Sequence, residues 1–109
     1  MHTVQTELHG AQLLTLTDRL DAEAAPELEQ RCERLIGRQT RTLIVNLSTL
    51  DYLSSAGLCA LLNLAKLAKA RQSRLILCGP TPAVRQILNL SGFDKILPIS
   101  EELSEALTL

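Results

Sequence analysis

The chain has 109 residues, of which 46% are hydrophobic, and its eleven basic and twelve acidic side chains give a formal net charge of −1. Such a length fits one domain, residues 1–109, whose core must be aliphatic because the chain holds one Phe, one Tyr and no Trp. The near-neutral charge and the scarcity of aromatic residues give direct nucleic-acid binding no electrostatic or stacking support, and no apolar run approaches the ~20 residues of a membrane span. The first residues also lack the basic-then-apolar order of a signal peptide, so we expect a cytoplasmic protein.

The cysteines argue against disulfide and metal chemistry. Cys32, Cys59 and Cys78 are odd in number and widely spaced, and each has apolar neighbours, which predicts reduced thiols buried in the core. A metal site needs Cys or His residues at short spacing, and His2 and His9 do not provide it. We therefore expect neither a metal nor another cofactor.

Two patterns of different period open the chain. In "TVQTELHGAQLLTLT", residues 3–17, apolar residues alternate on both sides of residues 9–10 and predict a β-hairpin. The next segment changes to a helical period, which predicts an amphipathic helix that begins near Pro26 and ends at Gly37. Its apolar face holds Leu28, Cys32, Leu35 and Ile36.

Strands and helices alternate in the rest of the chain. Short apolar runs at residues 42–47 and 74–78 predict strands that are covered on both faces. Between them, residues 57–71 form the longest helical pattern.

The C-terminal third adds two helices and a strand. Thr81 and Pro82 predict a helix N-terminus as cap and first residue, and Gly92 predicts its end. This helix is expected to bury Val84, Ile87 and Leu88. "KILPI" predicts a short last strand, and "SEELSEAL" predicts a helix that starts at Ser100 with acidic residues in its first turn. The whole order, two strands and then helices alternating with strands, predicts an α/β fold with a mixed sheet and helices packed on it.

Ser54 and Ser55 interrupt the apolar segment "DYLSSAGLCALL" where the strand pattern gives way to the helical one. A serine there can cap the helix by accepting a hydrogen bond from a free N–H group, which needs only one of the two. A catalytic nucleophile has little support, because the segment lacks G-x-S-x-G and Ser-x-x-Lys patterns and both histidines lie in the hairpin. A phosphoacceptor is the third interpretation, because a helix N-terminus favours the negative charge of a phosphate.

A phosphate at this turn would disturb a partner more than the fold. If a partner covers the turn and the adjacent flank of the helix, the added charge is desolvated in the interface. Helical geometry places Leu64 at the border of the sheet-facing side and Leu67 almost opposite to it, so both are candidate partner contacts. The alternative for Leu67 is a singly exposed leucine, or one that packs under a neighbouring loop. The positions expected to face the sheet are Leu58, Leu61, Leu62 and Ala65.

Three segments resemble, in order and spacing, the STAS domain of bacterial anti-sigma-factor antagonists: "LTDRLDAEAAPELEQ", "TLIVNLSTLDYLSSAGLCALLNLAKLAKAR" and "RLILCGPTPAVRQILNLSGFDKILPI". The resemblance extends from about Thr3 to Ile99 and implies a mixed sheet with helices packed mainly on one side. It also implies a function without enzymatic activity. The unphosphorylated domain binds an anti-sigma factor, itself a serine kinase of the GHKL ATPase type, and so releases a sigma factor. Phosphorylation by that kinase inactivates the domain, and a serine phosphatase restores it.

By position in the family motif, the phosphoacceptor is Ser55, and the contact turn is formed with Ser54, Ala56, Gly57 and Leu58. Many members have Asp where this chain has Ser54, and Ser or Thr where it has Ala56. Glycine at position 57 allows either the close approach of a partner or a backbone angle that other residues resist.

Two polar residues before the turn are candidates for supporting it. Asn46 is expected either to fix the turn through side-chain hydrogen bonds or simply to end the strand. Asp51 either adds local negative charge or is a solvated turn residue. The resemblance leaves a second function open, that of a subunit bound to the ATPase of a bacterial phospholipid-transport system. A small serine-dependent or nucleotide-binding enzyme is the alternative from chemistry.

Overall fold

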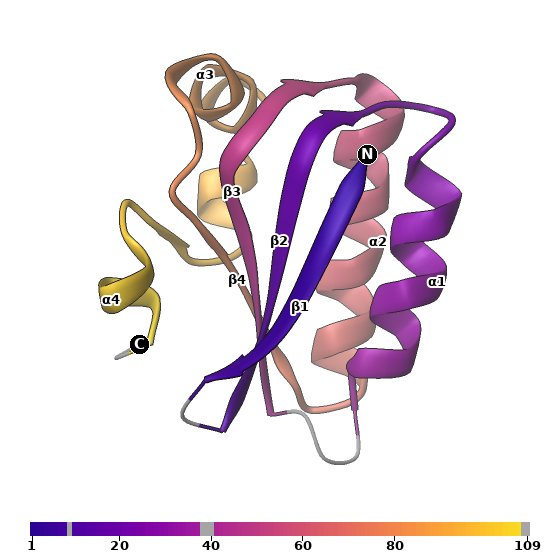
Figure 1. The fold of residues 1–109 in the computed structure, drawn as a ribbon, viewed down its shortest axis with the longest axis vertical. Helices are drawn as coiled ribbons and strands as arrows, with labels where there is room; N and C mark the ends of the chain where they lie inside the picture. The colour runs from indigo at the N-terminus through magenta and orange to yellow at the C-terminus, as the bar shows by residue number, and fades with distance from the viewer. Residues whose placement is uncertain (9, 38–40, 108–109) are drawn as a thin grey trace.

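The computed structural model describes residues 1–8, 10–37 and 41–107, and its elements follow the predicted order, with one short helix added (Figure 1). The N-terminal half contains β1 (His2–Leu8), β2 (Ala11–Leu20), α1 (Ala25–Leu35) and β3 (Thr42–Leu53). The C-terminal half contains α2 (Ser55–Ala70), β4 (Arg74–Cys78), α3 (Pro82–Leu90), the 3₁₀ helix η1 (Phe93–Lys95), β5 (Ile99–Ser100) and α4 (Leu103–Ala106).

The strands of the described residues form one mixed sheet in the order β1-β2-β3-β4-β5. β1 pairs antiparallel with β2, which confirms the predicted hairpin, although His9 in its turn lies outside the described residues. β2, β3, β4 and β5 are parallel neighbours, because a helix crosses over between each pair of successive strands. The predicted α/β fold with a mixed sheet is therefore confirmed.

The helices cover the two faces of the sheet unequally. In Figure 1, α1 and α2 lie side by side over one face, whereas the short α4 lies on the opposite face. α3 packs against β3, and its Val84 and Leu88 join the core cluster that α1 and α2 cover. The helices thus pack mainly on one side, as expected. No helix within the described ranges is long and apolar enough to cross a lipid bilayer.

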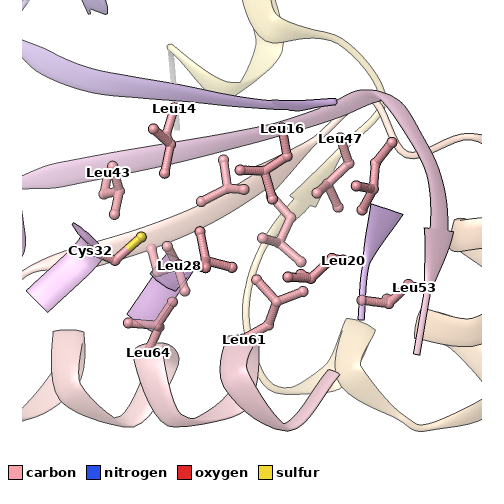
Figure 2. Packing of buried hydrophobic residues seen from close by; sticks show 14 of the residues in the cluster. Leu14, Leu16, Leu20, Leu28, Cys32, Leu43, Leu47, Leu53, Leu61 and Leu64 are labelled. Carbon is pink, nitrogen blue, oxygen red and sulfur yellow. The ribbon is translucent and has the colours of Figure 1, made fainter. Parts of the chain in front are cut away.

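The central strands alternate between two apolar layers, as strands covered on both faces must. Ile44 of β3 and Ile76 of β4 face α4, together with Ala106 of that helix. The next residues along the same strands face α1 and α2, where leucines from both helices and the sheet interlock (Figure 2). The larger cluster includes Leu14, Leu16, Leu20, Leu28, Cys32, Leu43, Val45, Leu47, Leu61, Leu64 and Leu77. This layer fixes α2 against the sheet and so fixes the position of its N-terminus.

The ends of α1 and α3 agree with the sequence signals. Pro26 lies in the first turn of α1, and Gly37, with a φ of 125°, follows the helix end. Thr81 caps α3 by accepting a hydrogen bond from the Val84 N–H at 3.4 Å. Ile87, expected to be buried in α3, is only half-buried.

β3 is twice as long as predicted, since it continues from residue 47 to Leu53. Its second half pairs with the end of β2 through two register shifts, near Thr15–Thr17 and Asp18–Arg19. The shifts leave Leu47, Leu50 and Leu53 buried at every third residue, with polar residues exposed between them. The prediction ended too early because this spacing matches neither strict alternation nor a continuous apolar run.

The C-terminal prediction was wrong in its boundaries. Residues 95–97 are not a strand: Lys95 is the last residue of η1, in which Phe93 is buried, and β5 contains only Ile99 and Ser100. Ser100 therefore belongs to the strand and does not start α4, whose N-cap residue is Glu102 without a side-chain hydrogen bond. Leu97 and Ile99 of "KILPI" attach this irregular segment to the core, whereas Ile96 is exposed.

Two of the three cysteines are buried as predicted, and the third is not. Cys32 and Cys78 lie in the two apolar layers, where burial raises the pKa of the Cys32 thiol to about 12 and that of Cys78 to about 11. Cys59 is exposed on α2, because its position on the helix faces away from both the sheet and α1.

The cysteines should therefore differ in reactivity. At pH 8 in the native protein, dithionitrobenzoate is expected to modify Cys59 within minutes and leave Cys32 and Cys78 unmodified until the chain is unfolded. Counting released thiolate in the native protein, in urea and in a Cys59→Ser variant measures this directly. Rapid reaction of a second thiol in the native protein would contradict the burial of Cys32 and Cys78.

Candidate functional site

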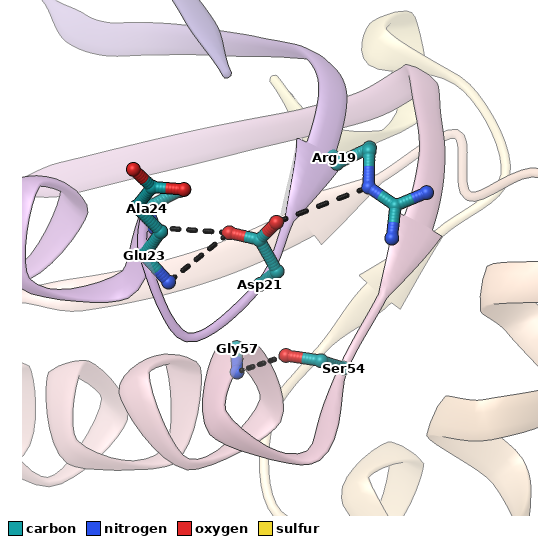
Figure 3. Close-up of polar contacts among 6 residues, drawn as sticks. All are labelled: Arg19, Asp21, Glu23, Ala24, Ser54 and Gly57. Carbon is teal, nitrogen blue, oxygen red and sulfur yellow. Dashed lines mark hydrogen bonds and ion pairs between the residues drawn. The ribbon is translucent and has the colours of Figure 1, made fainter.

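The two serines at the start of α2 have different structural roles. Ser54 is the N-cap residue, and its Oγ accepts a hydrogen bond from the Gly57 N–H at 3.1 Å (Figure 3). Its backbone N–H donates to the Leu20 carbonyl at 3.0 Å, which joins the turn to the end of β2. Ser55 is the first residue of the helix and is exposed. The cap interpretation is thus confirmed for Ser54, and α2 begins two residues earlier than predicted because of it.

Removing the cap should cost stability without touching the core. Ser54→Ala is expected to lower the free energy of unfolding by about 1 kcal/mol, because the Gly57 N–H loses its acceptor at the helix end. Urea denaturation followed by circular dichroism measures the difference. Ser54→Asn keeps a capping side chain and should stay within about 0.5 kcal/mol of the original protein. Equal losses for both variants would mean that the hydrogen bond is not the cause.

Packing within the chain already requires a glycine at position 57. It is buried in the first turn of α2, and a Cβ at this position would lie 2.5 Å from the Leu20 carbonyl oxygen and 2.9 Å from the Leu53 Cδ1. The prediction that Gly57 is part of the contact surface is therefore wrong, because the ends of β2 and β3 already cover this residue. The neighbouring Ala56 and Leu58 are half-buried and flank the exposed Ser55.

The flank of α2 also differs from the prediction. Leu64 is only 2% exposed and belongs to the core, so it cannot serve as a surface contact. Leu67 does not point into solvent but packs, half-buried, against the same cluster. The cause is α1, which packs alongside α2 and widens its apolar face beyond the side that the sheet covers. Leu58, Leu62 and Ala65, expected to face the sheet, are correspondingly only half-buried.

The two residues predicted to support the turn lie elsewhere in β3. Asn46 is within the strand and links three strands: its Nδ2 donates to Thr15 Oγ1 at 3.4 Å, and its Oδ1 lies 3.8 Å from Cys78 Sγ. The same Oδ1 accepts from the Ser48 N–H at 3.1 Å. Asn46 therefore stabilises the sheet and makes none of these bonds to the turn. Asp51 is an exposed strand residue, not a turn residue.

The loop between β2 and α1 lies beside the turn that precedes α2 (Figure 3). No role for this loop is predicted from the sequence. Asp21 Oδ1 accepts hydrogen bonds from the N–H groups of Ala24 at 3.0 Å and Glu23 at 3.2 Å. The hydrogen bond from the Ala24 N–H has the largest effect on the Asp21 carboxylate. Together with the bond from Glu23 and the charge of Arg19, it holds the pKa of Asp21 below its usual range. The carboxylate therefore organises the loop near neutral pH and loses this role as the pH falls through its pKa.

Arg19 lies next to Asp21 and contacts Tyr52. The Arg19 guanidinium lies 4.2 Å from the centroid of the Tyr52 ring, and its Nε lies 3.8 Å from Asp21 Oδ2. Both side chains are substantially exposed, and the pairing of Arg19 with Tyr52 in the sheet brings them together. The sequence holds no signal for this contact, because it depends on the shifted register of β2 and β3.

Comparison with known proteins gives a consistent match. The family model for the STAS domain matches residues 3–106. A curated relative from Bordetella bronchiseptica, named "Putative anti-sigma factor antagonist BtrV", is 31% identical over 100 residues, which cover 92% of this chain and 86% of the relative.

Solved structures extend the match to the fold. An anti-sigma factor antagonist from Mycobacterium paratuberculosis superposes with a TM-score of 0.88 at 26% identity, over 98% of this chain and 91% of the other. The Bacillus cell fate determinant SpoIIAA in its phosphorylated form has the same fold, with a TM-score of 0.75 at 21% identity over 98% of this chain and 97% of that one.

Proposed function

Because the chain belongs to the STAS domain family and is similar to anti-sigma factor antagonists, we propose that it binds an anti-sigma factor and thereby releases a sigma factor. It acts as an interaction module in the cytoplasm and not as an enzyme. The partner is a serine kinase of the GHKL ATPase type, which phosphorylates Ser55, and a serine phosphatase reverses the modification. The contact surface is the exposed part of the first turn of α2, formed by Ser54, Ser55, Ala56 and Leu58.

The observation that carries this proposal is the division of roles between the two serines. Ser54 supplies the cap that α2 needs, so the neighbouring hydroxyl is not required for the helix end. Ser55 is exposed at the first helical position, where a kinase can reach it. A phosphate there would also lie near the free N–H groups and the positive end of the helix dipole, which favour negative charge. The monomer can therefore accept the modification without loss of its fold.

The same phosphate would weaken the binding of a partner. A phosphoserine carries a charge of about −1.5 to −2 at neutral pH. In the free protein this charge stays hydrated, but in a complex it would be taken out of water at the centre of the contact turn, at a cost of several kcal/mol. Typical binding free energies of about 8 to 12 kcal/mol leave little margin for such a loss. Phosphorylation of Ser55 would thus release the partner.

The acceptor can be identified with a matched pair of variants. The protein is isolated from its own cells to recover the kinase that co-purifies with it. Purified kinase and ATP are then incubated with the original protein, Ser55→Ala and Ser54→Asn, and phosphate is mapped by mass spectrometry. We expect one phosphate, on Ser55, which is absent in Ser55→Ala and present in Ser54→Asn because that variant keeps a cap.

Other results would point elsewhere. Phosphate on Ser54, or no phosphate with a kinase that binds tightly, would contradict the proposed switch. Partner binding that is unaffected by both Ser55→Ala and Ser55→Asp would favour the transport-associated subunit instead.

A further inference from the structure

A hollow of about 430 Å³ lies between the second half of α2, the start of β4 and residues 96–98. Its volume is within the range of about 300–1,000 Å³ that is usual for small-molecule sites. The α2 residues that line it begin at Leu62, seven positions after Ser55, which is about 10 Å along the helix axis. It is therefore separate from the contact turn, and we call it the α2–β4 pocket.

The walls of the α2–β4 pocket are mostly apolar, and part of this apolar surface is in contact with water. Ile96, which lines it, is 55% exposed and adds a large aliphatic side chain to the apolar surface that solvent reaches. Leu75 and Leu97 line it as well and belong to the core, so the base of the pocket consists of packed side chains. The remaining apolar lining consists of Leu62, Ala65, Ala68 and Pro98. An occupant that covers these side chains would gain hydrophobic free energy.

The rim of the pocket is positively charged. Lys66 and Lys69 are exposed and three residues apart on α2, so they lie on the same side of the helix. Neither lysine forms an ion pair with another residue within the ranges that the structure describes. The third basic residue of the lining is Arg74, and no acidic residue of the described chain lines the hollow. An apolar base with a cationic rim is complementary to a molecule that has an apolar chain and one anionic end.

We propose that the α2–β4 pocket binds an amphiphilic carboxylate, with its alkyl chain over Leu75, Leu97 and Ile96 and its carboxylate between Lys66 and Lys69. The volume has room for roughly a dozen water-sized groups, since each occupies about 30 Å³. A saturated carboxylate of ten carbons matches this size. The proposal does not depend on the function of the contact turn, because the two sites share α2 but no residue.

The test uses the full chain and a homologous ligand series. Sodium hexanoate, octanoate and decanoate, each below its micellar concentration, are titrated into isotopically labelled protein, and backbone amide shifts are followed by NMR. We expect shifts at residues 62–69, 73–75 and 96–98, and an affinity that rises up to about fourfold for each added methylene. The Ser55→Asp variant should bind decanoate equally well, which separates this proposal from the phosphorylation switch.

Substitutions test the head group and the chain separately. The double variant Lys66→Gln, Lys69→Gln should weaken decanoate binding about tenfold, because charge-assisted hydrogen bonds are lost, whereas Arg34→Gln on the exposed face of α1 should not. Ala65→Phe should block the pocket and abolish binding, while thermal melting shows that the domain is still folded. Decyltrimethylammonium, with the same chain and the opposite charge, should bind at least tenfold more weakly than decanoate.

Four results would overturn the proposal. Equal binding of decanoate and decyltrimethylammonium would show that the lysines have no role. Amide shifts spread over the whole surface, or none at millimolar decanoate, would show that there is no defined site. Shifts at the same amides on raising the protein concentration alone would assign the hollow to contact with a second copy of the chain.

Discussion

Ser55→Asp is expected to weaken binding of the anti-sigma factor at least a hundredfold, while the isolated domain keeps its stability. The loss corresponds to about 2.7 kcal/mol, within the cost of desolvating a charge at the centre of an interface. At the first position of α2 the same charge interacts favourably with the helix dipole, so we expect the free energy of unfolding to be unchanged or to rise by about 0.3–1 kcal/mol. Isothermal titration calorimetry and urea denaturation measure the two effects.

Ser55→Asn is the matched control, because asparagine has nearly the shape of aspartate without its charge. We expect its affinity for the partner to remain within about threefold of the original protein. If Ser55→Asn were as weak as Ser55→Asp, the size of the side chain and not its charge would disturb the complex. If Ser55→Asp unfolded the domain, the switch would act on the fold and the proposed mechanism would be wrong.

Gly57→Ala should lower the free energy of unfolding by about 2 kcal/mol, although alanine is normally better than glycine in a helix by about 1 kcal/mol. The added Cβ would lie 2.5 Å from the Leu20 carbonyl oxygen and 2.8 Å from the Leu20 Cγ, so α2 must move away from the end of β2. The Leu20 carbonyl also accepts from the Ser54 N–H, and that bond would lengthen with the shift. Thermal or urea unfolding of the two proteins measures the loss.

Cys59→Ala serves as the control for helix propensity. Cys59 is exposed two residues further along α2, and this substitution should leave stability unchanged or raise it by about 0.5 kcal/mol. A Gly57→Ala variant that is more stable than the original protein would show that the close contact with Leu20 can relax at no cost. We also expect Gly57→Ala to weaken partner binding, because Ser55 moves with the displaced turn.

The order of elements could be predicted because each carries a local signal. The hairpin alternates, "TLIVNL" and "RLILC" are continuous apolar runs, and Pro26 and Thr81 mark helix starts by their own chemistry. The cap at Ser54 belongs to the same class, since a capping side chain acts on N–H groups three residues away. These features depend on short stretches of chain and not on the rest of the fold.

The predictions that the structure corrects all depend on which other elements pack against the residue concerned. Leu64 was placed at the border of an exposed flank because the sequence does not reveal that α1 packs against α2. Asn46 was linked to the turn because its partners, Thr15 and Cys78, become neighbours only through the parallel pairing of three strands. Gly57 was ambiguous for the same reason, because Leu20 is 37 positions away in the sequence. Such tertiary contacts leave no periodic pattern to read.

The position of β1 at one edge of the sheet has a consequence for how the domain opens. Most of its side chains are exposed, Val4 by 60%, and its hydrogen bonds join it to β2 alone among the strands. Separating this strand would expose little of the leucine cluster between the sheet and the two long helices. Its amide protons should therefore exchange with solvent through local fraying, while those of β3 and β4 exchange only when the whole domain unfolds. The surface that carries Ser55 belongs to the slowly exchanging part, because α2 rests on those central strands.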